Sequence, residues 1–277
     1  LKQIDDAHRI YTAVEGQFSK RPEHDQLLNE WALVLYEAER YGEADELFLR
    51  ITNEHPDSTI ADNARFSLAE SDLVNGKVQF ARTSFAALAA DAKADAEVRE
   101  DSLFRIIGIE ADTQQWKDVT VSADEFTKQF VESQYTSDVE FYRGNAQLNL
   151  GDVESAEKTF TQLADQANNP AVSQSAWVGH LWALLAESQV QQKKYEAVIA
   201  TAEMARAWKA NSPTHYMLDE VVGRAWKNQA KFTEATVAFT RVIESESGSR
   251  TETAAKAQLM LAEIYFLQKK YPEARDG

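Results

Sequence analysis

The sequence contains no cysteine and, among 277 residues, only ten glycines and five prolines. The lack of cysteine excludes disulfide bonds, zinc-thiolate sites and thiol nucleophiles, and it is compatible with an oxidising compartment as well as with the cytosol. The scarcity of glycine and proline, together with 44% hydrophobic residues, argues against a disordered chain. We therefore expect a well-packed protein.

Basic residues are also few, since 29 Lys and Arg face 45 Asp and Glu, which gives a net charge of −16. Such a charge disfavours sequence-independent binding to nucleic acid or anionic lipid, so a basic or neutral partner fits better. No apolar run approaches the length of a membrane span, and residue 1 is Leu. We expect no membrane span, and we expect the sequence to be an excerpt or a processed form.

Residues 28–58 form the clearest unit of the sequence. Apolar residues recur there at helical spacing, first as Leu28, Trp31, Ala32 and Leu35, then as Ala44, Phe48 and Ile51. Gly42 is expected where the chain turns between the two helices, and Pro56 is expected to end the second helix. The unit predicts an amphipathic helical hairpin.

This hairpin pattern recurs along the chain. The expected equivalents of Ala44 are Ala7, Ala81, Val119, Ala156, Ala197, Ala235 and Ala274, at intervals of 37 to 41 residues. Residues four and seven positions later are mostly aromatic or aliphatic; in the fifth copy these are Thr201 and Met204. A pair that is usually small or aliphatic recurs in the first helices: Trp31-Ala32, Leu68-Ala69, Ile106-Ile107, Arg143-Gly144, Leu184-Leu185, Val222-Gly223 and Leu261-Ala262.

The unit resembles the tetratricopeptide repeat (TPR) family. Trp31-Ala32, Ala44, Phe48 and Pro56 fall at the family's spacing, although Leu35 replaces the usual tyrosine. The resemblance implies an all-α, right-handed superhelical solenoid of helix-turn-helix hairpins that binds other polypeptides. The period, above the usual 34 residues, resembles bacterial envelope TPR proteins: the lipoprotein of the β-barrel assembly machine and the Tol–Pal coordinator.

We expect one solenoid over residues 1–277. It would comprise a half repeat (1–24), six repeats (25–58, 62–94, 100–133, 137–170, 178–213 and 216–249) and a truncated repeat (255–277). The prolines at 22, 56, 170 and 213 lie between these hairpins. The truncated repeat is expected to expose apolar surface on Leu259, Leu261, Ile264 and Tyr265, which would be covered by further chain or by self-association.

The sequence offers no chemistry of catalysis. It has no nucleophile elbow, phosphate-binding loop, dinucleotide-binding turn or calcium loop. No two of its histidines, at positions 8, 24, 55, 180 and 215, are spaced as a pair on one helix face. We predict that the protein is not an enzyme and has no metal site or cofactor.

Four aromatic residues share one place in successive first helices: Phe66, Phe104, Phe141 and Trp182, here called the aromatic row. In a TPR solenoid this place faces the concave groove, so the row is predicted to bind a polypeptide. Glu70 and Asp101 nearby would favour a partner with Lys or Arg beside its apolar anchors. The alternative is that the rings only fill space between repeats.

A basic group near the C-terminal end, which includes Arg224, Lys227 and Lys231, is the one place where an acidic partner could bind. We predict a non-catalytic protein-binding scaffold of a bacterial envelope assembly, in the periplasm or cell envelope. The alternative is an adaptor or regulatory module of a larger cytoplasmic protein.

Overall fold

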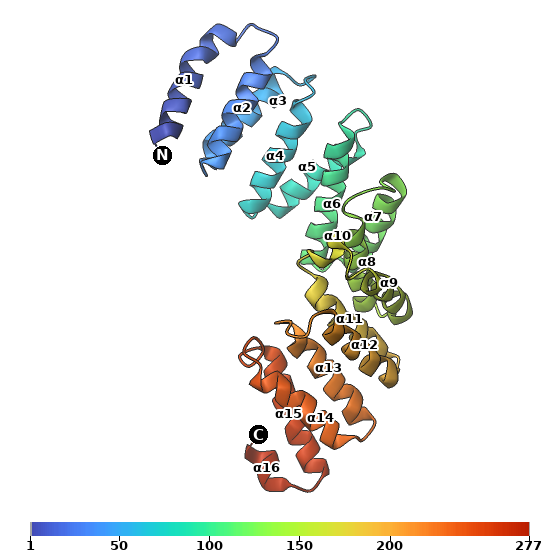
Figure 1. Ribbon diagram of the computed structural model, residues 1–277. Coiled ribbons are helices and arrows are strands. Elements are labelled where there is room, and N and C mark those ends of the chain that lie inside the picture. Colours follow the sequence, from blue (N-terminus) through green and yellow to red (C-terminus); the bar gives the residue numbers. More distant parts are fainter. Residues whose placement is uncertain (1, 277) are drawn as a thin grey trace. The chain divides into compact units, whose positions relative to one another are not determined.

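The computed structural model describes residues 2–276, which form α-helices joined by turns and short loops (Figure 1). No β-strand occurs among these residues, so the prediction of an all-α fold is confirmed. The chain divides into two compact units, which we describe separately. Unit 1 contains Leu1–Gln114 with Lys128–Phe130, and unit 2 contains Gln115–Thr127 with Val131–Gly277. The prediction of a single solenoid stays a prediction.

Unit 1 is a stack of helices drawn from blue to green in Figure 1. Its helices are α1 (Lys2–Phe18), α2 (His24–Glu37), α3 (Tyr41–Glu54), α4 (Ala61–Val74), α5 (Val78–Ala90) and α6 (Ala96–Asp112). Each helix packs against the next one in the chain, and α4 also contacts α6. Leu28, Leu35, Phe48 and Ile51 are almost fully buried in its core.

Unit 2 continues the pattern of paired helices. Its helices are α7 (Trp116–Gln129), α8 (Thr136–Asn149), α9 (Val153–Asp165), α10 (Pro170–Ser173), α11 (Val178–Gln191), α12 (Tyr195–Trp208), α13 (His215–Asn228), α14 (Phe232–Glu244), α15 (Glu252–Leu267) and α16 (Tyr271–Asp276). Helices α8 and α9, α11 and α12, α13 and α14, and α15 and α16 pack as hairpins.

The second helices of the hairpins share one register. The third residue after the start of each is fully buried in six copies: Ala44, Ala81, Val119, Ala156, Val198 and Ala235. The predicted aromatic residue four positions later is also buried in four copies: Phe48, Phe85, Phe160 and Phe239. This part of the periodicity prediction is confirmed.

In the fifth copy the predicted register is wrong by one residue. Helix α12 buries Val198, Ala202 and Ala205, whereas Ala197 is only partly buried and Met204 is 46% exposed. A shift of one residue turns a side chain by about 100° around a helix, which is enough to move it off the core face. The loop before this copy carries the short helix α10, and the buried equivalent of Ala156 is Val198 rather than the predicted Ala197.

The turns within the hairpins share a residue with a left-handed backbone conformation at the same position. The residue two positions before each second helix has a positive φ; these residues are Glu39, Gly76, Gln114, Gly151, Lys193, Ala230 and Lys269. In six of these turns the next residue donates its backbone N–H to the carbonyl five residues earlier, as Lys231 does to Trp226 at 3.0 Å. This is the helix-ending motif that favours glycine. Gly42 lies inside α3, so its predicted place in the turn is wrong.

Two first helices need glycine for close packing. A Cβ on Gly144 would lie 2.6 Å from the ring of Phe160, and one on Gly223 would lie 2.5 Å from the ring of Phe239. The predicted small residue of the first helix therefore makes room for the aromatic residue of the second. Ala32 and Ala69 take the same place before Phe48 and Phe85.

The C-terminal copy is better covered than expected. Leu261 and Ile264 are buried against Phe239 and Val242 of α14, so the prediction that they are exposed is wrong. Leu259 is exposed as predicted. Both helices of the preceding hairpin, α13 and α14, pack against α15, and so does α16.

Candidate partner-binding site

In unit 1 the predicted site residues lie on two neighbouring first helices. Phe66 and Glu70 are four residues apart on α4, and Asp101 and Phe104 are three residues apart on α6, so each pair shares a helix face. Arg105 of α6 places its Nε atom 2.9 Å from Oε1 of Glu70. The structure therefore brings these side chains onto one surface, here called the α4/α6 surface.

The aromatic rings of this surface are each partly buried. The Phe66 ring packs against Phe85 of α5 with its centroid 5.2 Å away. Phe104 is likewise neither fully buried nor fully exposed. One side of the Phe66 ring thus belongs to the core of the hairpin, and part of each side chain stays accessible.

Glu70 lies in an unusual electrostatic environment. Burial raises the pKa of its carboxyl group, the charge of Arg105 opposes this rise, and the negative charge of Asp101 adds to it. Its buried Oε1 atom accepts no hydrogen bond within the described part of the chain, because the contact with Arg105 lacks hydrogen-bond geometry. A further cation beside Glu70 and Asp101 would stabilise both carboxylates.

In unit 2 Phe141 is engaged in packing. Its ring stacks on Trp177 at 4.7 Å with an angle of 14° and also contacts Phe160. The indole nitrogen of Trp177 donates a hydrogen bond of 2.6 Å to Asp138. These contacts fix the Phe141 ring between α8, α9 and the loop before α11.

Trp182 belongs to the core, with only 3% of its surface exposed. It packs against Trp208 of α12 at 6.1 Å. Gly144 and Gly223 each lie nine residues before the second helix of their hairpin. In the hairpin of α11 and α12, the residue at this distance is Ala186, whereas the sequence predicted Leu185. The predicted register of α11 was therefore one residue off, and the place of the aromatic row in this copy is taken by the partly buried Ala183.

The predicted basic group is largely paired within unit 2. Arg224 forms ion pairs with Glu187 and Glu220, and Lys227 pairs with Glu263. The ammonium of Lys231 lies over the Trp226 ring, 4.5 Å from its centroid. These internal partners leave little unbalanced positive charge for an acidic ligand.

A cavity of about 880 Å³ lies in unit 1 near the end of α3 and the start of α4. Pro56, Asp62, Arg65, Leu88 and Asp91 are among its lining residues. The described lining contains no histidine, and Oγ of its Ser58 donates a hydrogen bond to the carboxylate of Asp25 on α2.

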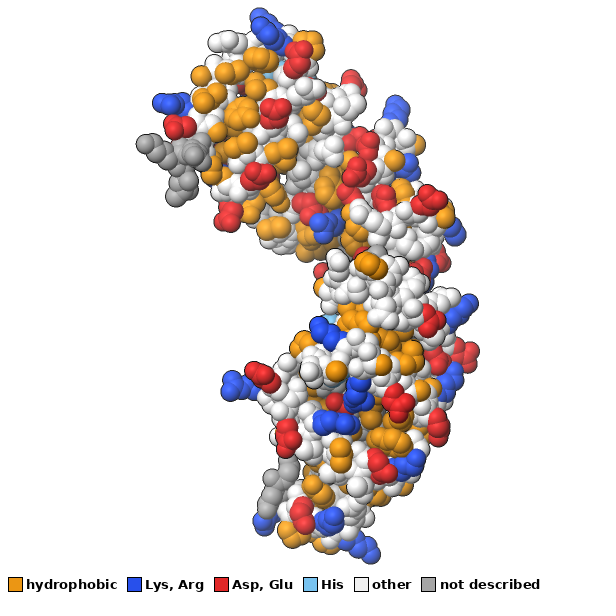
Figure 2. Space-filling model, viewed as in Figure 1, with side chains coloured by type: hydrophobic (Ala, Val, Ile, Leu, Met, Phe, Trp, Pro, Cys, Tyr) orange, Lys and Arg blue, Asp and Glu red, His pale blue; other side chains and the backbone are white. Residues whose placement is uncertain are grey.

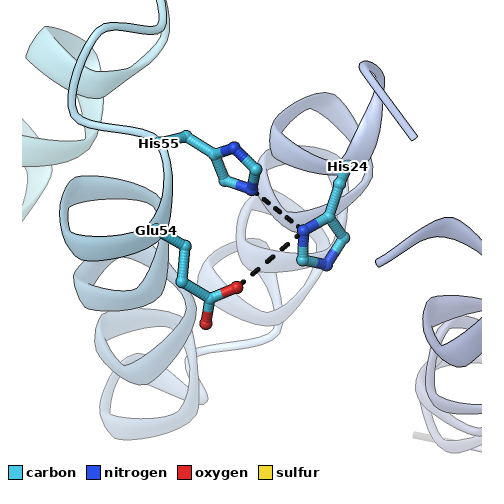
Figure 3. A group of neighbouring side chains, drawn as sticks. All are labelled: His24, Glu54 and His55. Carbon is cyan, nitrogen blue, oxygen red and sulfur yellow. Dashed lines mark hydrogen bonds and ion pairs between the residues drawn. The ribbon is translucent and has the colours of Figure 1, made fainter. Parts of the chain in front are cut away.

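The structure brings together three side chains that sequence reasoning did not connect. His24 begins α2, Glu54 ends α3 and His55 follows it, and their side chains converge in Figure 3. Nδ1 of His24 lies 2.9 Å from Nε2 of His55. Spacing along one helix face does not reveal this cluster, because the antiparallel hairpin joins the start of its first helix to the end of its second. The two histidines, 31 residues apart, stand at those two ends.

Comparison with known proteins supports the architecture. A family model described as a tetratricopeptide repeat-like domain matches residues 102–259, and no curated protein matches the chain. A TPR protein from Parabacteroides merdae is similar in structure, with a TM-score of 0.61, 14% identity and coverage of 90% of this chain and 89% of that one. The C-terminal part of a TPR protein from Cytophaga hutchinsonii has a TM-score of 0.63, 12% identity and coverage of 92% and 94%.

The apo form of RapI is also similar, with a TM-score of 0.64, 13% identity and coverage of 97% of this chain and 77% of RapI. At these identities the likeness concerns the fold alone. None of the described helices has the length and apolar character needed to cross a membrane. Because the family model covers more than half of the sequence and helices pair as hairpins within both units, the chain belongs to the tetratricopeptide repeat-like family, whose members generally serve as protein-interaction modules.

Proposed function

We propose that the protein is a non-catalytic scaffold that binds a polypeptide on the α4/α6 surface of unit 1. The observation that carries this proposal is the carboxylate of Glu70, partly buried between two helices and not fully neutralised, with a partly accessible aromatic ring on each helix beside it.

The charge of this surface favours a basic segment. Arg105 supplies one positive charge against the two negative charges of Glu70 and Asp101. A lysine or arginine from the partner would restore the balance of charge beside Glu70 and Asp101. Association should therefore weaken as salt concentration rises.

The rings of Phe66 and Phe104 would supply the apolar part of the contact. Aromatic side chains bury a large area and lose few rotamers on binding, so they are frequent anchors of interfaces. On the face seen in Figure 2, hydrophobic side chains lie among acidic and basic ones. The proposed ligand is thus an extended or helical segment with apolar residues next to Lys or Arg.

The test begins with capture of the partner in cells by a photoreactive amino acid at position 105, followed by affinity measurements with the purified partner. We expect Phe104→Ala and Glu70→Gln each to weaken binding by roughly 1–3 kcal/mol without loss of helicity. Circular dichroism and isothermal titration would measure the two quantities.

The matched control is Phe80→Ala, since Phe80 lies on α5 of the same unit and is 69% exposed. This change should leave affinity unaltered. If Phe80→Ala weakens binding and Phe104→Ala does not, the partner lies on the second-helix side and the proposal is wrong.

We also propose that this scaffold works in a bacterial envelope assembly, in the periplasm or cell envelope. The support is the long repeat interval, which is 37 or more residues between the starts of successive second helices. The alternative is an adaptor module of a larger cytoplasmic protein. Fractionation of cells that express the full-length gene would decide, because recovery in the cytosol alone contradicts an envelope role.

A further inference from the structure

The end of the first hairpin of unit 1 gathers nitrogen and oxygen donors around one point. His24 Nδ1, His55 Nε2 and a carboxylate oxygen of Glu54 all lie within 4.8 Å of one another, and they point toward a common centre in Figure 3. Nδ1 of His24 is 2.9 Å from His55 Nε2 and 3.8 Å from Glu54 Oε2. The cluster therefore has the donors and the spacing to be examined as a metal site.

We propose that His24, His55 and Glu54 bind a divalent transition metal ion, with Zn²⁺ as the first expectation. Ligand atoms about 2.0–2.2 Å from a tetrahedral zinc ion lie about 3.4 Å from one another. The two measured separations lie on either side of this value, so small rotations of the partly exposed Glu54 and His55 side chains would complete the set. Two imidazoles and one carboxylate suit zinc, nickel or copper rather than calcium or magnesium, which prefer oxygen.

The other nitrogen of His24 supports this assignment. Its Nε2 atom is buried, accepts or donates no hydrogen bond within the described residues, and lies 3.5 Å from Oε1 of Glu15. The carboxylate favours the tautomer with hydrogen on Nε2, which leaves the lone pair of Nδ1 directed at His55 and Glu54. A carboxylate behind the outer nitrogen of a histidine is the usual support of a metal ligand.

Arg50 organises the two carboxylates without filling the centre. Its NH2 group lies 2.7 Å from Glu15 Oε1, and its Nε lies 2.8 Å from Glu54 Oε1. Oε2 of Glu54, which accepts a longer hydrogen bond of 3.4 Å from Arg50, is the carboxylate oxygen 3.8 Å from His24 Nδ1. Two carboxylates against one guanidinium give the cluster a net negative charge, which favours a cation.

A hydrogen bond between two neutral histidines would explain the 2.9 Å separation alone. It does not involve Oε2 of Glu54, which lies 3.8 Å from the same nitrogen of His24. A bound ion would satisfy all three donors. It would also join the start of α2 to the end of α3 and so close the hairpin.

The test uses untagged protein stripped with a chelator and titrated with zinc chloride, followed by calorimetry and thermal unfolding. We expect one ion per chain and a rise in the unfolding midpoint with zinc. His55→Gln and Glu54→Gln change partly exposed positions, and each should weaken binding by at least about tenfold, the lower end of what loss of an outer-shell partner costs. Cobalt should give the visible absorption of a tetrahedral site.

The matched control is His180→Gln, because His180 is an exposed histidine on α11 of unit 2. It should bind zinc like the parent chain. Circular dichroism of His55→Gln without metal would show whether it still folds. If the parent binds no zinc at millimolar concentration, or if His55→Gln and Glu54→Gln bind it unchanged, the cluster is only a structural contact and the proposal is overturned.

Discussion

At the scale of single residues, the turns within the hairpins use a left-handed backbone whether or not glycine is available. Gly76 and Gly151 adopt it with φ of 75° and 82°, whereas Ala230 adopts it with φ of 58°. A left-handed conformation costs an L-residue about 1–2 kcal/mol because Cβ crowds the following carbonyl oxygen. The packing of the two helices therefore overrides the local preference at five of these turns.

Ala230→Gly should raise the free energy of unfolding by about 0.5–1 kcal/mol, since relief of strain exceeds the extra entropy that glycine gives to the unfolded chain. Urea unfolding followed by circular dichroism measures the change. Gly151→Ala is the reverse control and should destabilise by a similar amount. A loss of stability in Ala230→Gly would contradict the strained turn.

At the scale of helices, the pairing of a small residue with an aromatic residue fixes how closely a hairpin packs. In the copy formed by α8 and α9, Phe160 fills the space that the absent side chain of Gly144 leaves. In the copy formed by α11 and α12, Ala186 and Ala202 are both small and buried, and Trp182 packs against Trp208 nearby. Hairpins of one length thus reach the same packing with different side chains.

Phe160→Ala should lower the free energy of unfolding by about 3–5 kcal/mol, because it removes a fully buried ring and leaves a cavity. Thermal and urea unfolding would measure it. Phe80→Ala, at an exposed position of α5, should cost under about 0.5 kcal/mol. Equal losses for the two variants would show that burial does not set the stability of the hairpin.

At the scale of the molecule, the C-terminal end of unit 2 combines several exposed apolar side chains. They are Leu259, Phe266, Leu267 and Tyr271, of which Phe266 is 64% exposed. Phe266 and Tyr271 contact each other at 5.7 Å, so part of this set forms a continuous surface. Such surfaces usually mark contacts with other molecules.

We expect the chain to self-associate through this end as its concentration rises. Light scattering should give a mass above that of the monomer, and Phe266→Ser should lower it. Phe80→Ser is the control with equal loss of apolar surface elsewhere. A monomer at millimolar concentration would contradict this prediction.

The surface predicted for a partner followed from the sequence only in part. Phe66, Glu70, Asp101 and Phe104 could be placed on neighbouring helices because each copy repeats the same spacing. Trp182 was misplaced, because one residue of error in register turns a side chain from one face of a helix to another. The segment that carries α10 lengthens the interval before α11, so the spacing of the other copies does not fix the register of this helix.

The sequence by itself determined the helical hairpins, their approximate lengths and most of their buried faces. The reason is that apolar periodicity is a local property, and it recurs in each copy of the hairpin. Only the tertiary structure decided which chain ends of a hairpin meet. His24 and His55 are 31 residues apart and share no helix face, so no local pattern connects them. Their contact arises because α2 and α3 are antiparallel and of nearly equal length, so the end of α3 lies beside the start of α2.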